Sequence, residues 1–232
     1  MVDRGRMRRH LIALLALCWS GGAIAQISAQ VSLASDYIYR GVTLTDNRPT
    51  AMVELNYDSP NGWFASGLAT ETRFFGERHY EPEYVVDAGY AHALAAGLTW
   101  EAGASYSVFS KATFWNYSEA FVGVLGEHWN ARLYYSPDYF GRGRRTWYAQ
   151  FDYAQPLVEH WNLIGHVGSF KSSGGEEDPH GHTFDASLGI AAKFGSASFE
   201  LKRSIADHDN YLYPLAPTTR RDNWIVSVAY SY

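Results

Sequence analysis

Apolar and polar side chains alternate along most of the chain with the two-residue period of a β-strand. Between Leu98 and Val108 the even positions are apolar, whereas the positions between them are polar or small. A strand points successive side chains to opposite faces, so such a segment has one apolar and one polar face. The same alternation recurs over 147–153 and 184–194. The pattern predicts an all-β chain in which each strand separates two different environments.

Followed from end to end, the alternation predicts twelve strands. Their ranges are 30–39, 50–57, 63–72, 83–92, 98–109, 117–125, 129–136, 146–154, 161–170, 183–194, 196–203 and 223–232. The connections alternate between short turns, such as 58–62, and long loops around 40–49, 171–182 and 204–222. An even strand number with short periplasmic turns and long outer loops is typical of a transmembrane antiparallel up-and-down β-barrel. Two of the segments have an ambiguous apolar face, which leaves ten strands as the alternative count.

Tryptophans stand at the start of several predicted strands. The sequence Glu-His-Trp-Asn occurs at 127–130 and again at 159–162, each time after a short turn, and Trp63 and Trp100 hold comparable positions. Amphipathic rings favour the headgroup layer of a membrane. The pattern therefore favours a membrane barrel with an aromatic rim at its periplasmic end. A soluble β-sandwich with tryptophans in its core is the alternative.

The C-terminal strand has one strongly apolar face. Alternate positions are filled by Trp224, Val226, Val228, Tyr230 and Tyr232. This set resembles the terminal strand that outer-membrane proteins present to the barrel-assembly machinery, so we expect that machinery as a partner during insertion. In a soluble protein, an edge strand this apolar would invite aggregation.

The first 25 residues have the features of a signal peptide. Four arginines precede an apolar run over 11–19, and Ala-Ile-Ala at 23–25 supplies the small residues that a signal peptidase requires. We expect cleavage before Gln26, which leaves 26–232 as an outer-membrane β-barrel. A lipoprotein signal at Cys18 is the alternative, but a leucine precedes that cysteine where a small residue is needed.

Composition and charge exclude several classes of protein. Removing the leader, with its four arginines and one aspartate, changes the net charge from −5 to −8, which argues against a nucleic-acid partner. An aromatic content of 16% excludes intrinsic disorder. No stretch after the leader approaches the roughly 20 apolar residues of a spanning helix, so a closed barrel is the way this chain can reside in a membrane.

A distinctive motif follows the first predicted strand. The sequence Ser-Asp-Tyr-Ile-Tyr-Arg-Gly-Val-Thr-Leu-Thr at 35–45 is followed by Pro49. It resembles the opening motif of the TorF family of bacterial porins, whose general form is Ser-Asp-Tyr-x-x-Arg-Gly-x-Ser-x-[Ser/Thr]; Thr43 stands where that form has serine. The resemblance implies an outer-membrane channel and transfers no known substrate.

The alternation places Asp36 and Arg40 on the inward face of the first strand, opposite Tyr37 and Tyr39. Four residues along a strand span roughly 13 Å, so we expect these two charges to engage neighbouring strands rather than each other. Gly41 is expected to free the backbone for a turn into the loop. Fixing that loop and contacting a solute both stay open as roles for the motif.

The apolar positions set the phase of each strand, and the opposite face collects the charges. The predicted pore-lining residues are Asp36, Arg40, Glu54, Arg73, Asp87, Glu101, Glu119, Arg132, Asp152, Asp185, Lys193, Glu200 and Lys202, joined on that face by Glu71 and Glu83. Acids outnumber bases, and no charge of the twelve segments is expected to face lipid, where it would cost about 2–4 kcal/mol at the midplane. Because isolated charges do not tolerate a dry interior, the lumen is wet or ion-paired. Twelve strands lie between filled eight-stranded barrels and open porins, which predicts a narrow pore with a modest cation preference.

Chemistry that would indicate an enzyme is scarce. None of the nine histidines is followed two positions later by serine, the His-x-Ser pairing in which lipase-type outer-membrane barrels resemble one another. The acidic, histidine-containing segment 176–182 could hold a divalent cation, although a solvated loop is the favoured interpretation. We expect no catalytic residues, no metal site and no cofactor.

The chain is therefore predicted to be an outer-membrane channel for passive diffusion of small hydrophilic solutes or ions, with both termini periplasmic. Arginines at 142–145 and 220–221 could contact lipopolysaccharide phosphates, with solvated loop charge as the favoured alternative. A closed, ion-paired barrel with a structural or surface-interaction role is the alternative function. Whether loop 204–222 folds inward as a plug stays open.

Overall fold

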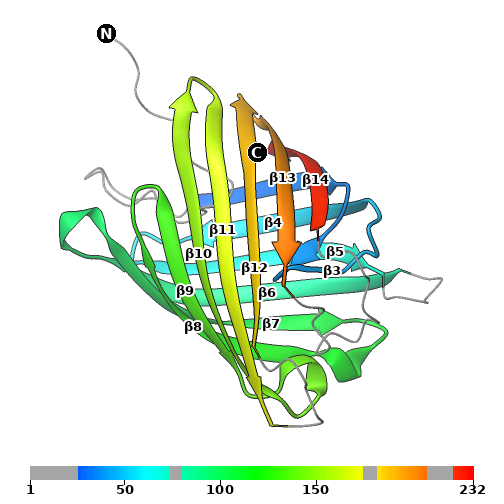
Figure 1. Cartoon of the computed structure of the whole chain (residues 1–232). Coiled ribbons are helices and arrows are strands. Elements are labelled where there is room, and N and C mark those ends of the chain that lie inside the picture. Colours follow the sequence, from blue (N-terminus) through cyan, green and yellow to red (C-terminus); the bar gives the residue numbers. More distant parts are fainter. Residues whose placement is uncertain (1–25, 74–79, 175–181, 208–221) are drawn as a thin grey trace.

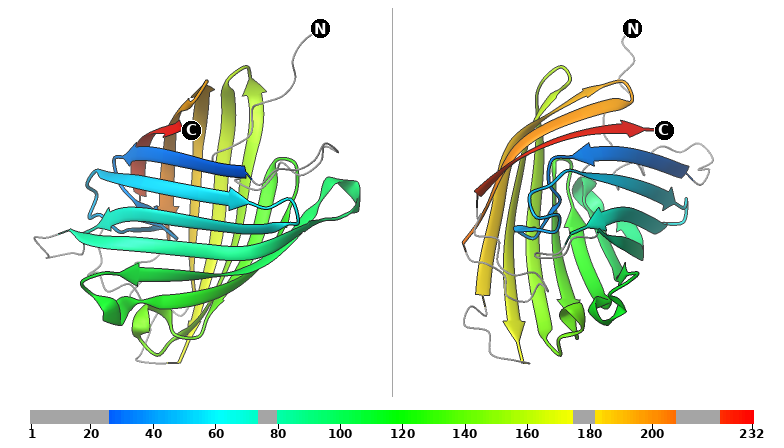
Figure 2. Two further views of the ribbon diagram at one scale, coloured as in Figure 1. Left: turned by 180° about the vertical axis from the view of Figure 1, so that it is seen from behind. Right: turned by 90° about the vertical axis from the view of Figure 1, so that its right-hand side faces the viewer.

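The computed structural model describes residues 26–73, 80–174, 182–207 and 222–232, whose strands form one closed antiparallel barrel (Figure 1). Within these ranges the twelve barrel strands are β1 (Gln26–Ala34), β4 (Thr50–Asp58), β5 (Trp63–Thr72), β6 (Glu81–Ala93), β7 (Thr99–Phe109), β8 (Tyr117–Leu125), β9 (Trp129–Ser136), β10 (Arg145–Val158), β11 (Trp161–Ser173), β12 (His182–Phe194), β13 (Ala197–Ala206) and β14 (Asp222–Ser231). β14 pairs with β1, where Val31 lies opposite Tyr230, and Figure 2 shows the two strands side by side. The predicted all-β transmembrane barrel with twelve strands is confirmed.

The predicted strand ranges agree closely with the structure except for the first. Segments 63–72 and 117–125, whose apolar face is ambiguous in the sequence, coincide with β5 and β8. The predicted strand 30–39 exists but its limits are wrong, because β1 begins at Gln26 and ends at Ala34, where the chain leaves the barrel wall. Beyond that point β2 (Ile38–Tyr39) and β3 (Val42–Thr43) form a separate two-stranded hairpin.

The tip of this hairpin requires a glycine for two reasons. Arg40 and Gly41 both have positive φ, at 50° and 78°, which reverses the chain within two residues. A Cβ at Gly41 would lie 2.7 Å from the Cβ of Asp185 on β12. The expected turn at Gly41 is confirmed, and it places the hairpin tip against β12 and β13.

The two ends of the barrel differ. β1 begins and β14 ends at the same end of the barrel. Short turns join the strands there, so we call it the turn end, and the longer connections lie at the other end, the loop end. Trp63, Trp129 and Trp161 each begin a strand at the turn end, and Trp100 is the second residue of β7. The four tryptophans therefore share one end of the barrel, as the sequence indicates.

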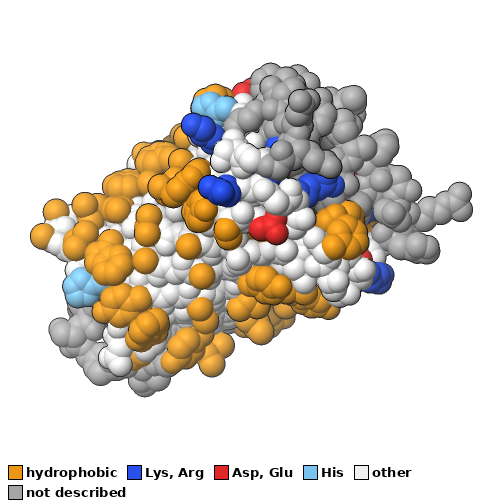
Figure 3. Space-filling model, turned by 90° about the horizontal axis from the view of Figure 1, so that it is seen from below, with side chains coloured by type: hydrophobic (Ala, Val, Ile, Leu, Met, Phe, Trp, Pro, Cys, Tyr) orange, Lys and Arg blue, Asp and Glu red, His pale blue; other side chains and the backbone are white. Residues whose placement is uncertain are grey.

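The outer face of the barrel is apolar. Leu55, Val86, Leu188 and Val226 are exposed by 55–62% although they belong to different strands. Figure 3 shows hydrophobic side chains spread over the wall on one face of the molecule. An apolar surface of this extent is unfavourable in water and matches the hydrocarbon layer of a membrane. Among the described residues, no helix is long and apolar enough to cross a membrane.

Two outward-facing charges correct the expectation that no charge of the strands faces lipid. Glu71 is exposed, whereas Thr70 and Thr72 beside it are buried, so the predicted inward phase of Glu71 is wrong. Arg203 on β13 is also exposed, and its Nε donates to Asp222 Oδ1 at 2.7 Å. Both positions lie near the loop end of their strands, where an outward charge costs little compared with the midplane.

Two positions on β12 test this division into two faces. Ile190 faces outward in register with Leu201 in the middle of β13, so Ile190→Arg should lower the free energy of unfolding by about 2–4 kcal/mol. Ser187 lines a cavity inside the barrel, so Ser187→Arg should cost clearly less. Urea unfolding in phospholipid vesicles measures both, and an equal loss would show that the faces of β12 are assigned wrongly.

Candidate functional site

The connection between β1 and β4 folds into the barrel and packs against other loops. Leu44, Phe109 and Tyr139 have no exposed surface. They belong to one buried cluster that also contains Ala112, Tyr117, Phe140, Tyr148 and Phe170. Partly buried Tyr37, Tyr39 and Val42 of the inserted segment pack on this cluster. The loop end of the lumen is therefore filled by an apolar, largely aromatic core.

Asp36 fixes the base of the inserted segment. Its Oδ1 accepts hydrogen bonds from the hydroxyls of Thr43 at 2.6 Å and Thr45 at 2.7 Å, and the Thr45 hydroxyl accepts the N–H of Tyr37 at 3.0 Å. Burial raises the pKa of the Asp36 carboxyl, and the two hydroxyl donors oppose that rise. The expected position of Asp36 on a strand is wrong, because the residue lies in the loop and holds its shape.

Arg40 attaches the hairpin tip to the barrel wall. Its Nη1 and Nη2 donate to the two carboxylate oxygens of Glu119 on β8 at 2.8 and 2.7 Å, and both side chains are almost fully buried. The rings of Tyr39, Tyr134 and Tyr148 surround the guanidinium at 4.3–5.0 Å from its carbon. A planar guanidinium suits both the bidentate pair and the ring stacking. The expectation that Arg40 lies on the first strand and engages a neighbouring strand is wrong, because Arg40 lies in the hairpin and reaches β8, which is not next to β1 in the barrel.

A second ion pair crosses three strands. Arg132 on β9 pairs with Glu101 on β7, and its Nη2 donates to Glu101 Oε2 at 3.2 Å. Gly123 on β8 lies in register between them. A Cβ at Gly123 would stand 2.7 Å from Glu101 Oε1, so the missing side chain gives the pair its room. Glu101 is fully buried by this arrangement.

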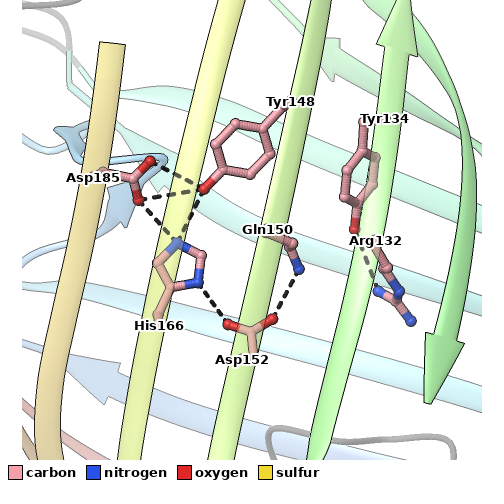
Figure 4. Close-up of polar contacts among 7 residues, drawn as sticks. All are labelled: Arg132, Tyr134, Tyr148, Gln150, Asp152, His166 and Asp185. Carbon is pink, nitrogen blue, oxygen red and sulfur yellow. Dashed lines mark hydrogen bonds and ion pairs between the residues drawn. The ribbon is translucent and has the colours of Figure 1, made fainter.

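The adjoining wall of β10 to β12 carries a polar network centred on His166 (Figure 4). His166 on β11 places Nδ1 2.6 Å from Asp152 Oδ1 on β10 and Nε2 2.9 Å from Asp185 Oδ1 on β12. The Tyr148 hydroxyl donates to Asp185 Oδ2 at 3.1 Å, and the Gln150 amide donates to Asp152 Oδ2 at 2.9 Å. Sequence analysis missed His166 and Tyr148 because it counted only side chains with a formal charge. Carboxylates lie at both ring nitrogens of His166 and the Tyr148 hydroxyl lies 3.0 Å from Nε2, so the network joins β10, β11 and β12.

Two cavities lie on either side of the hairpin. The smaller, of about 220 Å³, lies against β10 to β14, and the larger, of about 450 Å³, lies against β4 to β10. Tyr39, Arg40, Gln150 and Asp152 line both, so the hairpin tip divides the lumen. The larger cavity reaches the turn end of the barrel at Asp58. A volume of this size accommodates a small solute.

The predicted pore-lining residues take different positions in this lumen. The larger cavity is lined by Arg40, Glu54, Asp87, Glu119, Arg132 and Asp152, and also by Glu83. The smaller cavity is lined by Arg40, Asp152, Asp185 and Lys202.

The remaining predicted residues lie outside both cavities. Glu101 is buried behind Arg132, and Lys193 and Glu200 are half-buried on β12 and β13. Arg73 follows β5, outside the strands, where its N–H donates to the Leu44 carbonyl at 2.7 Å.

Several loop predictions fall wholly or partly outside the described residues. Residues 175–181 and 208–221 are not described, which removes the candidate cation segment, most of the loop considered as a plug, and the arginines at 220–221. Arg144 is buried, so the interpretation of 142–145 as solvated charge is wrong for that residue; Arg142 and Arg145 are exposed. In the described part of the chain, no group of three or more His, Cys, Asp or Glu residues is arranged to hold a metal ion.

Comparisons with known proteins agree with this fold. A family model described as "Bacterial protein of unknown function (Gcw_chp)" matches residues 20–232. The KdgM porin structure has a TM-score of 0.56 and 13% sequence identity, and the match covers 90% of this chain and 99% of the porin. The NanC porin structure has a TM-score of 0.56 and 10% sequence identity, and the match covers 88% of this chain and 99% of that porin. A KdgM porin in complex with disordered oligogalacturonate has 0.54 at 13%, covering 90% and 99%. No curated protein matches in sequence. At these identities the likeness to the solved structures is one of fold.

The Arg40–Glu119 pair should contribute strongly to stability. Glu119→Gln leaves a buried guanidinium without its carboxylate and should lower the free energy of unfolding by about 3–5 kcal/mol. Arg40→Met should show a similar loss, and the double variant should lose less than the two losses combined. Glu54→Gln is the matched control, because that carboxylate accepts from a neutral amide. Additive losses in vesicle unfolding would show that the pair is not coupled.

Proposed function

The chain belongs to the bacterial family of unknown function Gcw_chp, and we propose that it forms an outer-membrane channel for passive diffusion of small hydrophilic solutes or ions. The observation that carries the proposal is the pair of cavities lined by charged side chains on either side of the hairpin. Inward charges are costly to bury in a barrel filled with side chains, whereas water in an open lumen solvates them. The barrel fold, which is similar to that of the KdgM and NanC porins, supports the same proposal.

The lumen favours cations. Arg40 and Arg132 on the larger cavity are both ion-paired, whereas Glu54, Glu83 and Asp87 form no ion pair with any described residue. Carboxylates set in low-dielectric walls concentrate cations along a pore. The oligogalacturonate bound by the KdgM porin is a chain of uronic acids and hence a polyanion, which such a wall would repel. We therefore propose a narrow, modestly cation-preferring channel with a different class of solute.

One observation favours a second function. The aromatic core at the loop end, with Tyr139 and Phe140 almost fully buried, occupies the lumen between the hairpin and the loops. If that core blocks conduction, the protein is a closed barrel with a structural or surface-interaction role. Planar-bilayer recording of the parent protein separates the two functions, because a closed barrel gives no conductance.

Further proposals concern where the chain is located and how it is inserted. We propose that residues 1–25 are removed as a signal peptide, that both termini face the periplasm, and that the C-terminal strand engages the barrel-assembly machinery. The apolar outer face supports contact with outer-membrane lipid and lipopolysaccharide. The shared position of the β1 and β14 ends at the turn end supports the common side of the termini.

Tag accessibility tests the orientation. An epitope inserted in the 174–182 connection should be labelled on intact cells, because it lies at the loop end, whereas a C-terminal epitope should be labelled only after the outer membrane is opened. Labelling of the C-terminal epitope on intact cells would reverse the orientation.

Reversal potentials test the pore and its sign. In a KCl gradient the parent channel should prefer K⁺, and the preference should shrink at high salt as the Debye length falls from about 10 Å at 0.1 M to about 3 Å at 1 M. Glu54→Gln combined with Asp87→Asn should reduce the preference at low salt. Glu71→Gln is the matched control, because that carboxylate faces outward. An anion preference in the parent, or an unchanged potential in the double variant, would contradict the proposed path.

A further inference from the structure

We infer that the larger cavity is a binding site for linear aliphatic polyamines, solutes with two or three ammonium groups along a flexible hydrocarbon chain. The inference rests on the proposed channel, for which it names a solute class. It is carried by an unpartnered buried carboxylate, by the spacing of two further carboxylates, and by the aromatic wall that faces them.

Glu83 is the observation that points to a ligand. Its side chain lines the cavity, only 3% of the residue is exposed, and its Oε2 has no hydrogen-bond partner. No described Lys, Arg or His forms an ion pair with it. A buried carboxylate without a donor or counter-charge is costly. An ammonium group in the cavity would supply both at once.

Two more carboxylates continue the acidic wall from Glu83. Asp87 is four residues further along the same face of β6, roughly 13 Å away along the strand. Glu54 on β4 lies in register with Leu68 on β5, and β5 in turn pairs with β6. Asp87 accepts a hydrogen bond from the Ser66 hydroxyl at 3.0 Å, and Glu54 accepts one from an amide at 2.9 Å. The donors to both are neutral and neither forms an ion pair with a described residue, although the charge of Arg132 acts on Asp87. The separation of Asp87 from Glu83 suits a chain with separate ammonium groups.

The aromatic wall explains why the ligand is organic. Phe64, Phe121 and Tyr134 line the same cavity and form a continuous surface, with ring centroids 6.3 Å apart for Phe64 and Phe121 and 5.6 Å apart for Phe121 and Tyr134. Arg40 and Arg132 already lie over the rings of Tyr134 and Phe121, so the wall offers apolar contact to the methylene groups of a ligand rather than a site for its charge. A hydrated metal ion would use only the carboxylates, whereas a polyamine uses the carboxylates and the rings together.

Titration calorimetry on the refolded full chain in detergent micelles tests the site without requiring conduction. Spermidine should bind saturably, and Glu83→Gln combined with Asp87→Asn should weaken its binding at least about tenfold, or 1.4 kcal/mol. Glu71→Gln, on the outer face of the neighbouring strand, should bind spermidine like the parent. Citrate, a trianion of similar size, should not bind.

The outcomes separate the site from the channel. Heat-modifiable migration on gels shows that each variant is folded, and Asp87→Asn alone serves as a second variant with a smaller expected loss. Equal spermidine binding by the parent and the folded double variant would overturn the inference, as would Mg²⁺ binding as tightly as spermidine. Conductance without spermidine binding overturns the site and leaves the channel standing. Spermidine binding that the double variant loses, in a protein that never conducts, supports the site and overturns the channel.

Discussion

Backbone hydrogen bonding in hydrocarbon is the constraint on which the rest of this structure depends. A strand in lipid must pair on both edges, so the sheet has to close, and the pairing of β14 with β1 removes the last free edges. Closure in turn divides every strand into a lipid face and a lumen face. Charges near the middle of the strands must then face the lumen, whereas Glu71 and Arg203 face outward near the loop end.

Charges confined to the lumen are costly to bury, and here they form ion pairs with opposite charges on other strands. Arg132 reaches Glu101 over Gly123, and Arg40 reaches Glu119 from a hairpin that enters the barrel. Each pair is buried, so each depends on good geometry and on the tyrosines or the close packing around it. The Arg132–Glu101 pair therefore depends on Gly123, whose missing side chain gives the two charged groups their room.

The inserted hairpin links this packing to function. It carries the Ser-Asp-Tyr-x-x-Arg-Gly motif, which serves two mechanical roles: Asp36 shapes its base, and Arg40 joins its tip to β8. Because Arg40 is ion-paired with Glu119, it does not neutralise the other carboxylates of the larger cavity. The hairpin thus divides the lumen and leaves the carboxylates of β4 and β6 to set its electrostatic character.

The alternation of the sequence by itself determined the all-β class and most strand limits, because a two-residue period reports two environments directly, and it favoured twelve strands over ten. It also placed Glu54, Asp87 and Arg132 on the inner face. Only the tertiary structure could show that Tyr37 and Tyr39 are buried in the lumen, because an aromatic core and a lipid layer produce the same apolar alternation. The partners of Glu101, Glu119 and His166 were likewise decided by the register between strands distant in the chain, which no local pattern encodes.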